Sequence, residues 1–244
     1  MDEETEDATY GEIETNEFDH DTLAIVALPV YGGRVAPLAL KRLENIRGQD
    51  TPAVAVVLYG NRHYGEALEQ LADFLSNRGF RVIAAGTFIG EHSYSTPEFP
   101  IASRRPDRAD LHFARQFGLA IKDKIFRHPD APAVDVSTIE PPEQDEEAMK
   151  QFEQTVKEWM QQGVPMPSAP QVDASLCTGC NTCSYLCPTQ AISHDTPTTT
   201  NADACIKCCA CVKLCPVGAR TFKTPFSPLL SKLFAKQKEN KILL

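Results

Sequence analysis

The sequence predicts an α/β protein that carries a second, small domain rich in cysteine. Three apolar runs of strand length are separated by segments with helical spacing: Leu23–Val30, Ala53–Leu58 and Arg81–Ile89. Their lack of polar alternation is typical of parallel strands that are covered on both faces. All nine cysteines lie between positions 177 and 215. A dense patch of this kind indicates metal binding rather than a disulfide framework.

A helical pattern follows each of the three apolar runs. Ala36–Ile46 and Asp107–Phe126 repeat apolar residues at helical spacing, and Gly65–Arg78 places three leucines on one face. Gly79 follows the last of these segments and is suited to end its helix. Strands that alternate with helices in this way predict a doubly wound parallel sheet, which we assign to residues 22–128.

The charge of the chain is concentrated at its N-terminus. Residues 1–21 hold ten acidic side chains and neither Lys nor Arg, so that without them the net charge of −9 becomes +1. We interpret this stretch as a disordered, solvated leader, and docking to a basic partner is the alternative. The remaining sequence offers no clustered basic face, which argues against nucleic-acid binding.

Two further segments flank the cysteine domain. Residues 129–171 are rich in proline and contain one helical stretch, Glu143–Gln162, so we expect a linker with a docking helix. Residues 225–244 predict an amphipathic tail that packs back on the protein, or alternatively contacts a partner or a membrane surface. No apolar run reaches the length of a membrane span, and the acidic start is unlike a signal peptide, so we expect a cytoplasmic protein.

The cysteine domain, assigned to residues 172–224, contains an internal repeat with a shift of 28 residues. The pattern C-x2-C-x2-C-x3-C-P runs from Cys177 to Pro188 and recurs from Cys205 to Pro216. This is the signature of bacterial ferredoxins with two 4Fe-4S clusters, in which the fourth cysteine of each copy binds the other cluster.

The signature assigns four ligands to each cluster. The first set is Cys177, Cys180, Cys183 and Cys215, and the second is Cys205, Cys208, Cys211 and Cys187. Residues 173–222 therefore resemble a two-cluster ferredoxin, which implies a small α+β fold with approximate twofold symmetry. Structural zinc is the alternative, but zinc sites do not call for a third cysteine and a C-P pair in each copy. Cys209 lies outside the pattern and is interpreted as a spectator, with a reactive or ligand-exchanging thiol as the alternative.

The loops after the apolar runs resemble those of a flavodoxin. The matching stretches are LPVYGGRVAP at Leu28–Pro37, VVLYGNRHYGEAL at Val56–Leu68 and AAGTFIGEHSYS at Ala84–Ser95. The chain as a whole resembles bacterial and archaeal proteins in which a flavodoxin-like domain is fused to a two-cluster ferredoxin. The resemblance implies FMN as a candidate cofactor, held at the carboxyl ends of the strands. The flavin contacts that it implies are Tyr31, Gly32, Gly33, Arg34, Tyr59, Gly60, Asn61 and Tyr64.

Each of those flavin contacts also has a purely structural interpretation. The glycines suit any tight turn between a strand and a helix, and the tyrosines suit the edge of a core. The chain further departs from the flavodoxin pattern, since no T-G-x-T phosphate loop precedes Leu23. We expect a truncated sheet that lacks the first strand, leaves the edge of Leu23–Val30 open and binds FMN poorly, and we interpret the chain as N-terminally short.

These features lead to three hypotheses about function. The first is an electron carrier that passes single electrons through two clusters between redox protein partners, with FMN on the α/β domain as a further relay. The second is a flavin-dependent reductase that takes electrons from the clusters. The third is a ferredoxin whose α/β domain serves only for docking. We favour a carrier of anaerobic electron transport over a substrate-converting oxidoreductase.

Overall fold

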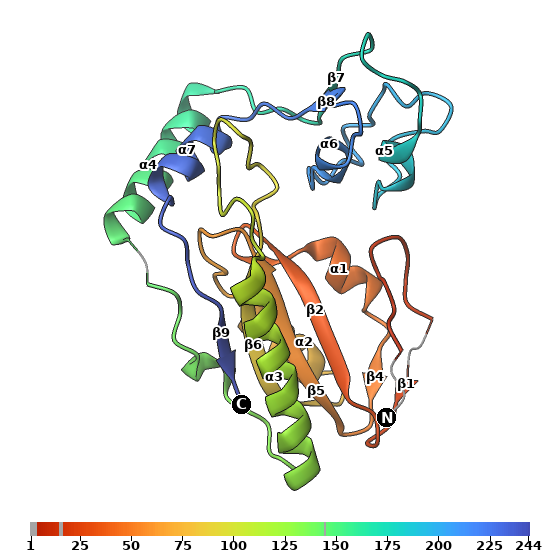
Figure 1. Cartoon of the computed structure of the whole chain (residues 1–244), viewed down its shortest axis with the longest axis vertical. Helices are drawn as coiled ribbons and strands as arrows, with labels where there is room; N and C mark the ends of the chain where they lie inside the picture. The colour runs from red at the N-terminus through yellow and green to blue at the C-terminus, as the bar shows by residue number, and fades with distance from the viewer. Residues whose placement is uncertain (1–3, 15–16, 144) are drawn as a thin grey trace. The chain divides into compact units, whose positions relative to one another are not determined.

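The computed structural model describes residues 4–14, 17–143 and 145–244, which form two compact units (Figure 1). The α/β unit comprises residues up to His92, then Ala102 onwards to the start of the acidic helix, and Lys236–Leu244. The cysteine unit comprises Ser93–Ile101 and Asp145–Ala235. These boundaries differ from those expected from the sequence, because a segment of the α/β sequence belongs to the cysteine unit and the end of the tail belongs to the α/β unit.

A five-stranded mixed sheet in the order β3-β2-β5-β6-β9 forms the centre of the α/β unit. The three apolar runs become β2 (Ala24–Tyr31), β5 (Thr51–Tyr59) and β6 (Phe80–Ile89), which pair in parallel. Two short strands, β3 (Arg34–Val35) and β9 (Lys241–Leu243), pair antiparallel with β2 and β6. The sheet with its helices is an α/β fold.

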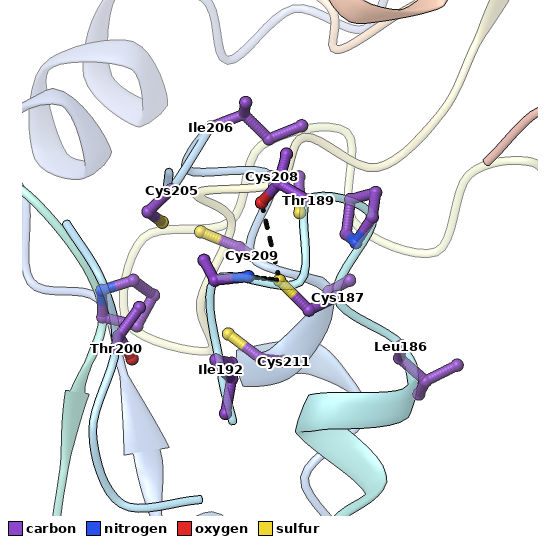
Figure 2. Close-up of a pocket in the computed structure, with 14 residues that line it drawn as sticks. Leu186, Cys187, Thr189, Ile192, Thr200, Cys205, Ile206, Cys208, Cys209 and Cys211 are labelled. Atoms are coloured by element: carbon purple, nitrogen blue, oxygen red, sulfur yellow. Dashed lines mark hydrogen bonds between the residues drawn. The ribbon is translucent and has the colours of Figure 1, made fainter. Parts of the chain in front are cut away.

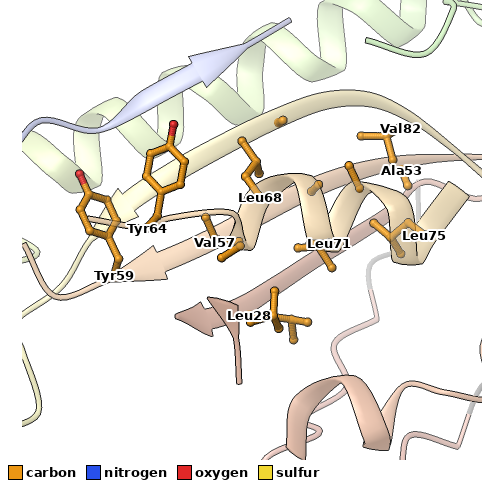
Figure 3. Close-up of a cluster of buried hydrophobic side chains, with 14 of the residues drawn as sticks. Leu28, Ala53, Val57, Tyr59, Tyr64, Leu68, Leu71, Leu75 and Val82 are labelled. Atoms are coloured by element: carbon orange, nitrogen blue, oxygen red, sulfur yellow. The ribbon is translucent and has the colours of Figure 1, made fainter. Parts of the chain in front are cut away.

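The two faces of the sheet bury separate clusters of side chains. On one face, α2 (Ala67–Ser76) packs its leucines against β2, β5 and β6 (Figure 3). On the other face, Phe117 and Ile121 of α3 (Arg108–Arg127) pack against Val54 and Ala84. Burial on both faces explains why the strands read as continuous apolar runs.

The strand β2 is only partly buried. Ile25 remains 60% exposed, and only Val30 and Tyr31 of this strand pair with β3. Within the part of the chain that the structure describes, the rest of this edge has no strand beside it. Two shorter elements follow, α1 (Pro37–Arg42) and β4 (Arg47–Gly48).

The acidic leader differs from the disordered segment that we expected. Its strand β1 (Glu17–Phe18) pairs in parallel with β4, and Ala8, Ile13 and Phe18 pack against the main core. Arg42 also donates a hydrogen bond to the backbone oxygen of Ala8. Apolar residues between the carboxylates anchor the described part of the leader. Residues 1–3, 15 and 16 lie outside the described residues.

The C-terminal tail is a helix only in its first half. The helix α7 (Phe226–Leu233) ends at Phe234, and the chain then extends to β9. Between these elements the tail is held by polar contacts to the α/β unit: Asn61 donates to the oxygen of Lys236 and accepts from the backbone N–H of Lys238. Asn240 accepts from the N–H of Ile89 at the end of β6. The tail therefore packs within the chain, as the first of our two interpretations expected.

The cysteine unit is built on two packed helices and a duplicated loop structure. The helix α4 (Glu146–Gln162) lies beside α7, with the rings of Phe152 and Phe234 5.8 Å apart. The segment Ser93–Ile101 joins them by burying Ile101 in the same cluster. The duplicated part contains α5 (Thr182–Tyr185) and α6 (Ala210–Lys213), with β7 (Gln171–Val172) paired antiparallel to β8 (Arg220–Thr221). The 3-10 turn Val136–Thr138 belongs to the α/β unit and lies between the two segments of the cysteine unit in the sequence.

Candidate metal centres

The backbone of the cysteine unit repeats with the same 28-residue shift as its sequence. The short helices α5 and α6 occupy equivalent positions, and both begin at a residue in the left-handed region, Asn181 with φ of 59° and Cys209 with φ of 60°. Two further equivalent pairs have positive φ: Gly179 with Lys207, and Gln190 with Gly218. Equal backbone conformations at equivalent positions show that both copies fold into the same loop.

Hydrogen bonds tie the two copies to each other in an equivalent way. The N–H of Asp173 donates to the oxygen of Ala219 at 2.8 Å, and the N–H of Asn201 donates to that of Ala191 at 2.7 Å. Asn201 is the equivalent of Asp173 in the repeat, and Ala191 is the equivalent of Ala219. In each hydrogen bond the donor therefore belongs to one copy and the acceptor to the other. Each copy therefore ends beside the beginning of the other, which is what a ligand set shared between them requires.

Four of the predicted ligands line one cavity (Figure 2). Cys205, Cys208 and Cys211 of the second motif meet Cys187 of the first in one small cavity. Apolar residues such as Pro170, Ile192 and Ile206 complete its wall. We call these four cysteines the second site, and Cys177, Cys180, Cys183 and Cys215, at the equivalent positions of the repeat, the first site.

Backbone N–H groups point at the fourth ligand of each site. The N–H of Ala191 donates to the sulfur of Cys187 at 3.2 Å. Burial raises the pKa of Cys215, but hydrogen bonds from the backbone N–H groups of residues 217–220 together lower it by more. The pKa of this thiol therefore lies below its ordinary value. Ala191 and Ala219 are equivalent in the repeat. Donors aimed at a sulfur favour its thiolate form, which is the form that binds iron.

The remaining thiols of the second site are held in apolar surroundings. Burial raises the pKa of Cys208, and it raises that of Cys211 to about 11. Such thiols lose their protons when a cation takes the proton's place. Cys180 of the first site is exposed instead, and the side chain of Thr182 lowers its pKa.

The donor set fits a pair of 4Fe-4S clusters. Each site supplies four thiols, and thiolates are the ligands of these clusters. The cavity gathers the four thiols of the second site, whereas the ligand set of the first site rests on the sequence repeat and stays a prediction.

Cys209 lies beside the second site without completing its pattern. Its side chain is 2% exposed, and burial, followed by the nearby cysteine thiolates, raises its pKa to about 12. The sulfur approaches the backbone oxygen of Lys207 at 3.6 Å. A buried, protonated thiol agrees with the spectator interpretation, which stays a prediction.

The structure also places an aromatic residue at the second site that the sequence did not single out. Burial raises the pKa of Tyr94 to about 12, and the side chains of Cys209, Cys205 and Cys208 add to this shift. The rings of Tyr94 and Phe222 lie 5.3 Å apart. Because Tyr94 is about a hundred residues away in the sequence, no local pattern could have indicated this contact.

The residues expected to contact a flavin differ in burial: some lie in the protein interior and others near the surface. The two loops lie together, since Gly33 accepts a hydrogen bond from the N–H of Glu66 and approaches Gly65 closely. Tyr59 and Tyr64 are buried at the edge of the main core with their rings 5.7 Å apart (Figure 3). Asn61 is fully buried by its contacts with the tail.

The other five expected contacts lie nearer the surface. Gly60 packs closely against His92, and Gly32 and Gly33 form the turn between β2 and β3. Tyr31 is half-buried, and Arg34 forms an exposed ion pair with Glu66. The three interior side chains therefore serve the core and the tail in this structure, and flavin binding by these loops stays a prediction.

Comparison with known proteins identifies one part of the chain. No curated protein and no solved structure gives a significant match. Residues 170–193 and 198–221 each match the 4Fe-4S binding domain family. Among the described residues, no helix is both long and apolar enough to cross a membrane. The two matched segments coincide with the two copies that carry the cysteine sites, so residues 170–221 are a ferredoxin-like, iron–sulfur-binding part of this chain.

Proposed function

We propose that this protein transfers single electrons between redox protein partners through two 4Fe-4S clusters, one at each site. The observation that carries the proposal is the cavity in which Cys187 of the first motif joins Cys205, Cys208 and Cys211 of the second. A simple metal site made by one motif alone would not need this exchange. The family match over both copies supports two clusters rather than one.

The residues of the two sites supply what such a carrier needs. Each cluster, when bound, accepts and releases one electron. The cysteine thiolates hold it, the N–H groups near Cys187 and Cys215 stabilise the negative charge on the sulfurs, and apolar neighbours such as Ile192 exclude water. One electron leaves the donor protein and one reaches the acceptor protein. No proton or covalent bond changes place, so no acid, base or nucleophile is required of the chain.

Anaerobic reconstitution tests this proposal. We expect about eight irons and eight sulfides per chain, the content of two cubanes. The Cys187→Ala variant should lose about half of the iron, because it removes one ligand of the second site. The Cys209→Ala variant is the matched control and should keep all of it. A colourless protein that binds zinc and no sulfide would refute the proposal.

FMN exchange on the α/β unit is a second candidate function. Its support is the position of the segments Tyr31–Arg34 and Tyr59–Tyr64, which begin at the carboxyl ends of neighbouring parallel strands. Open α/β sheets bind ligands at such ends. The tail contacts of Asn61 argue for the docking alternative instead. Flavin extraction and titration with FMN decide between them: stoichiometric yellow protein supports exchange, and absence of binding leaves the α/β unit as a docking module.

A further inference from the structure

We propose that the two sites are unequal: the second site is sheltered and holds the cluster of lower reduction potential, while the first site is the port through which partners exchange electrons. This inference rests on the proposed function. It concerns features that the cysteine pattern does not contain, since the two motifs have identical spacing. Three differences between equivalent positions of the repeat carry it.

The first difference is burial. Cys180 of the first site is exposed, whereas its equivalent Cys208 is half-buried, and Cys183 is half-buried where Cys211 is buried. The fourth ligands, Cys187 and Cys215, are both half-buried, but the Pro188 that follows Cys187 is buried and the Pro216 that follows Cys215 is exposed. Every stretch that forms the second site is at least as buried as its equivalent at the first site.

The second difference is a cover that reaches the second site from elsewhere in the sequence. The segment Ser93–Ile101 lies against the second copy of the repeat, where the ring of Tyr94 packs 5.3 Å from the ring of Phe222. Polar contacts hold this segment in place within the cysteine unit: Lys213 donates to the oxygen of Ser95 at 2.7 Å, and Ser227 donates to that of Tyr94 at 2.9 Å. At its far end, Ile101 is buried with Leu230. The cover is thus fixed at both ends.

The third difference is the supply of hydroxyl groups. Thr182 lies 3.4 Å from the sulfur of Cys180, and Thr178 stands two residues before that cysteine in the sequence. Their equivalents beside Cys208 are Ala210 and Ile206, which have no hydroxyl. One hydroxyl favours the second site, that of Thr189 at 3.6 Å from the sulfur of Cys187, where the first site has Val217. The balance still favours the first site.

Most of these differences lower the potential of the second site, whereas the hydroxyl of Thr189 and the positive charge of buried Arg220 near Cys211 act the other way. Reduction adds a negative charge to a cluster that its four thiolates already make anionic. Water and hydrogen bonds to sulfur stabilise that added charge, and burial in apolar surroundings opposes it. We therefore expect the second site to be harder to reduce, with a lower potential than the first.

Exposure also makes the first site the accessible one. Leu176 and Leu214 are each next in sequence to one of its ligands and are 51% and 53% exposed. Such apolar side chains around an exposed ligand suit contact with a redox protein. An electron taken from a donor there can be held at the first site or passed to the second, and the donor is oxidised by the loss of that electron.

Redox titration of the reconstituted full chain, monitored by EPR, tests the inequality. We expect two one-electron steps whose midpoints differ by at least tenfold in equilibrium constant, about 59 mV for one electron. The Cys180→Ser variant, which disrupts the first site, should keep the lower step. Two equal midpoints in a protein with about eight irons would overturn this inference and leave the proposed function intact. A protein without iron or sulfide would refute the proposed function itself.

Substitutions away from the ligands test the causes. Tyr94→Ala should admit water to the second site and raise the lower midpoint by about tenfold in equilibrium constant, whereas Tyr94→Phe keeps the ring and should leave it unchanged. Thr182→Ala should lower the upper midpoint, and its equivalent exchange, Ala210→Thr, should raise the lower one. A shift of the upper midpoint by Tyr94→Ala, or no shift of either, would overturn the assignment.

Discussion

Asp110 and Arg105 form a largely buried ion pair in the α/β unit. Arg105 donates to both carboxylate oxygens of Asp110, and Asn240 of the tail donates to the same carboxylate at 2.8 Å. Asp110 also accepts from the N–H of Asp107 and thereby closes the cap of α3. One side chain therefore joins a helix start, a loop and the C-terminal tail.

Replacing Asp110 by Asn should destabilise the α/β unit by about 3 kcal/mol, because the guanidinium of Arg105 loses its ionic partner while still largely buried. The hydrogen bonds from Arg105, ahead of the opposing effect of burial, hold the pKa of Asp110 below its ordinary value. A lowered pKa in the folded state stabilises the fold above about pH 4, the unfolded value, and this contribution is lost as the pH falls through the folded value.

Denaturant unfolding followed by circular dichroism between pH 3 and pH 7 checks this prediction. The wild-type protein should lose stability in the acid range, and the Asp110→Asn variant should show a weaker pH dependence there. An unchanged unfolding midpoint at pH 7 for the variant would mean that the ion pair contributes nothing to the fold.

Comparing Gly32 with Gly65 distinguishes the cost of a strained backbone from the cost of a steric clash. Gly32 and Gly65 have nearly the same φ, 61° and 59°, in the left-handed region. A Cβ on Gly32 would meet nothing within 4 Å, whereas one on Gly65 would lie 2.3 Å from the oxygen of Gly33. The close approach of these loops sets the start of α2 against the turn between β2 and β3.

Gly32→Ala should therefore destabilise the protein by about 1 kcal/mol, which is the cost of a Cβ at positive φ. Gly65→Ala carries the same strain and adds a backbone clash, so the loss should be about 3 kcal/mol or more. Thermal unfolding of the two variants measures the difference. Equal losses would show that the loops separate without penalty.

The pairing of β9 with β6 depends on side chains outside the strand. Asn240 fixes the tail just before β9, through Ile89 and Asp110. The Asn240→Ala variant should raise hydrogen exchange at the amides of Lys241–Leu243 at least about tenfold, since about 1.4 kcal/mol of local stability is tenfold in an opening equilibrium.

Glu239→Ala is the control for the tail, because Glu239 contacts Tyr59 through its backbone oxygen, which alanine retains. Mass spectrometry of peptides after hydrogen exchange measures the exchange at Lys241–Leu243 in both variants. The same exchange rate in the two would contradict a specific role for Asn240.

At the scale of the whole chain, the two units differ in how much apolar core stabilises their fold. The α/β unit buries a continuous core along its sheet, whereas the duplicated part of the cysteine unit consists of loops and four-residue helices. Small loop-rich domains of this kind gain much of their folding free energy from bound metal. Loss of iron should therefore unfold one part of the chain and leave the other folded.

Iron chelation followed by brief trypsin digestion checks this expectation. Cleavage should appear at Lys207 and Lys213, and the strands of the α/β unit should keep their protection from hydrogen exchange. The reconstituted protein, digested under the same conditions, should resist cleavage at both lysines. Equal resistance after complete iron removal would show that the cysteine unit holds its fold without metal.

The sequence by itself determined the chemistry of the cysteine sites and the main elements of the sheet. Motif spacing is local, so it specified which thiols could surround a cluster, and the match of residues 170–221 to the 4Fe-4S binding domain family supports that prediction. Continuous apolar runs likewise specified β2, β5 and β6, because burial on both faces removes polar alternation.

Only the tertiary structure decided how distant segments are used. Phe18 of the acidic leader became a strand residue, Asn61 of an expected flavin loop became an anchor for the tail, and Tyr94 came to cover the second site. These contacts join residues far apart in the sequence, and their free energy depends on burial and hydrogen bonding that no short pattern encodes. The difference between two sites with identical motifs belongs to this class, since it arises from what surrounds each ligand set.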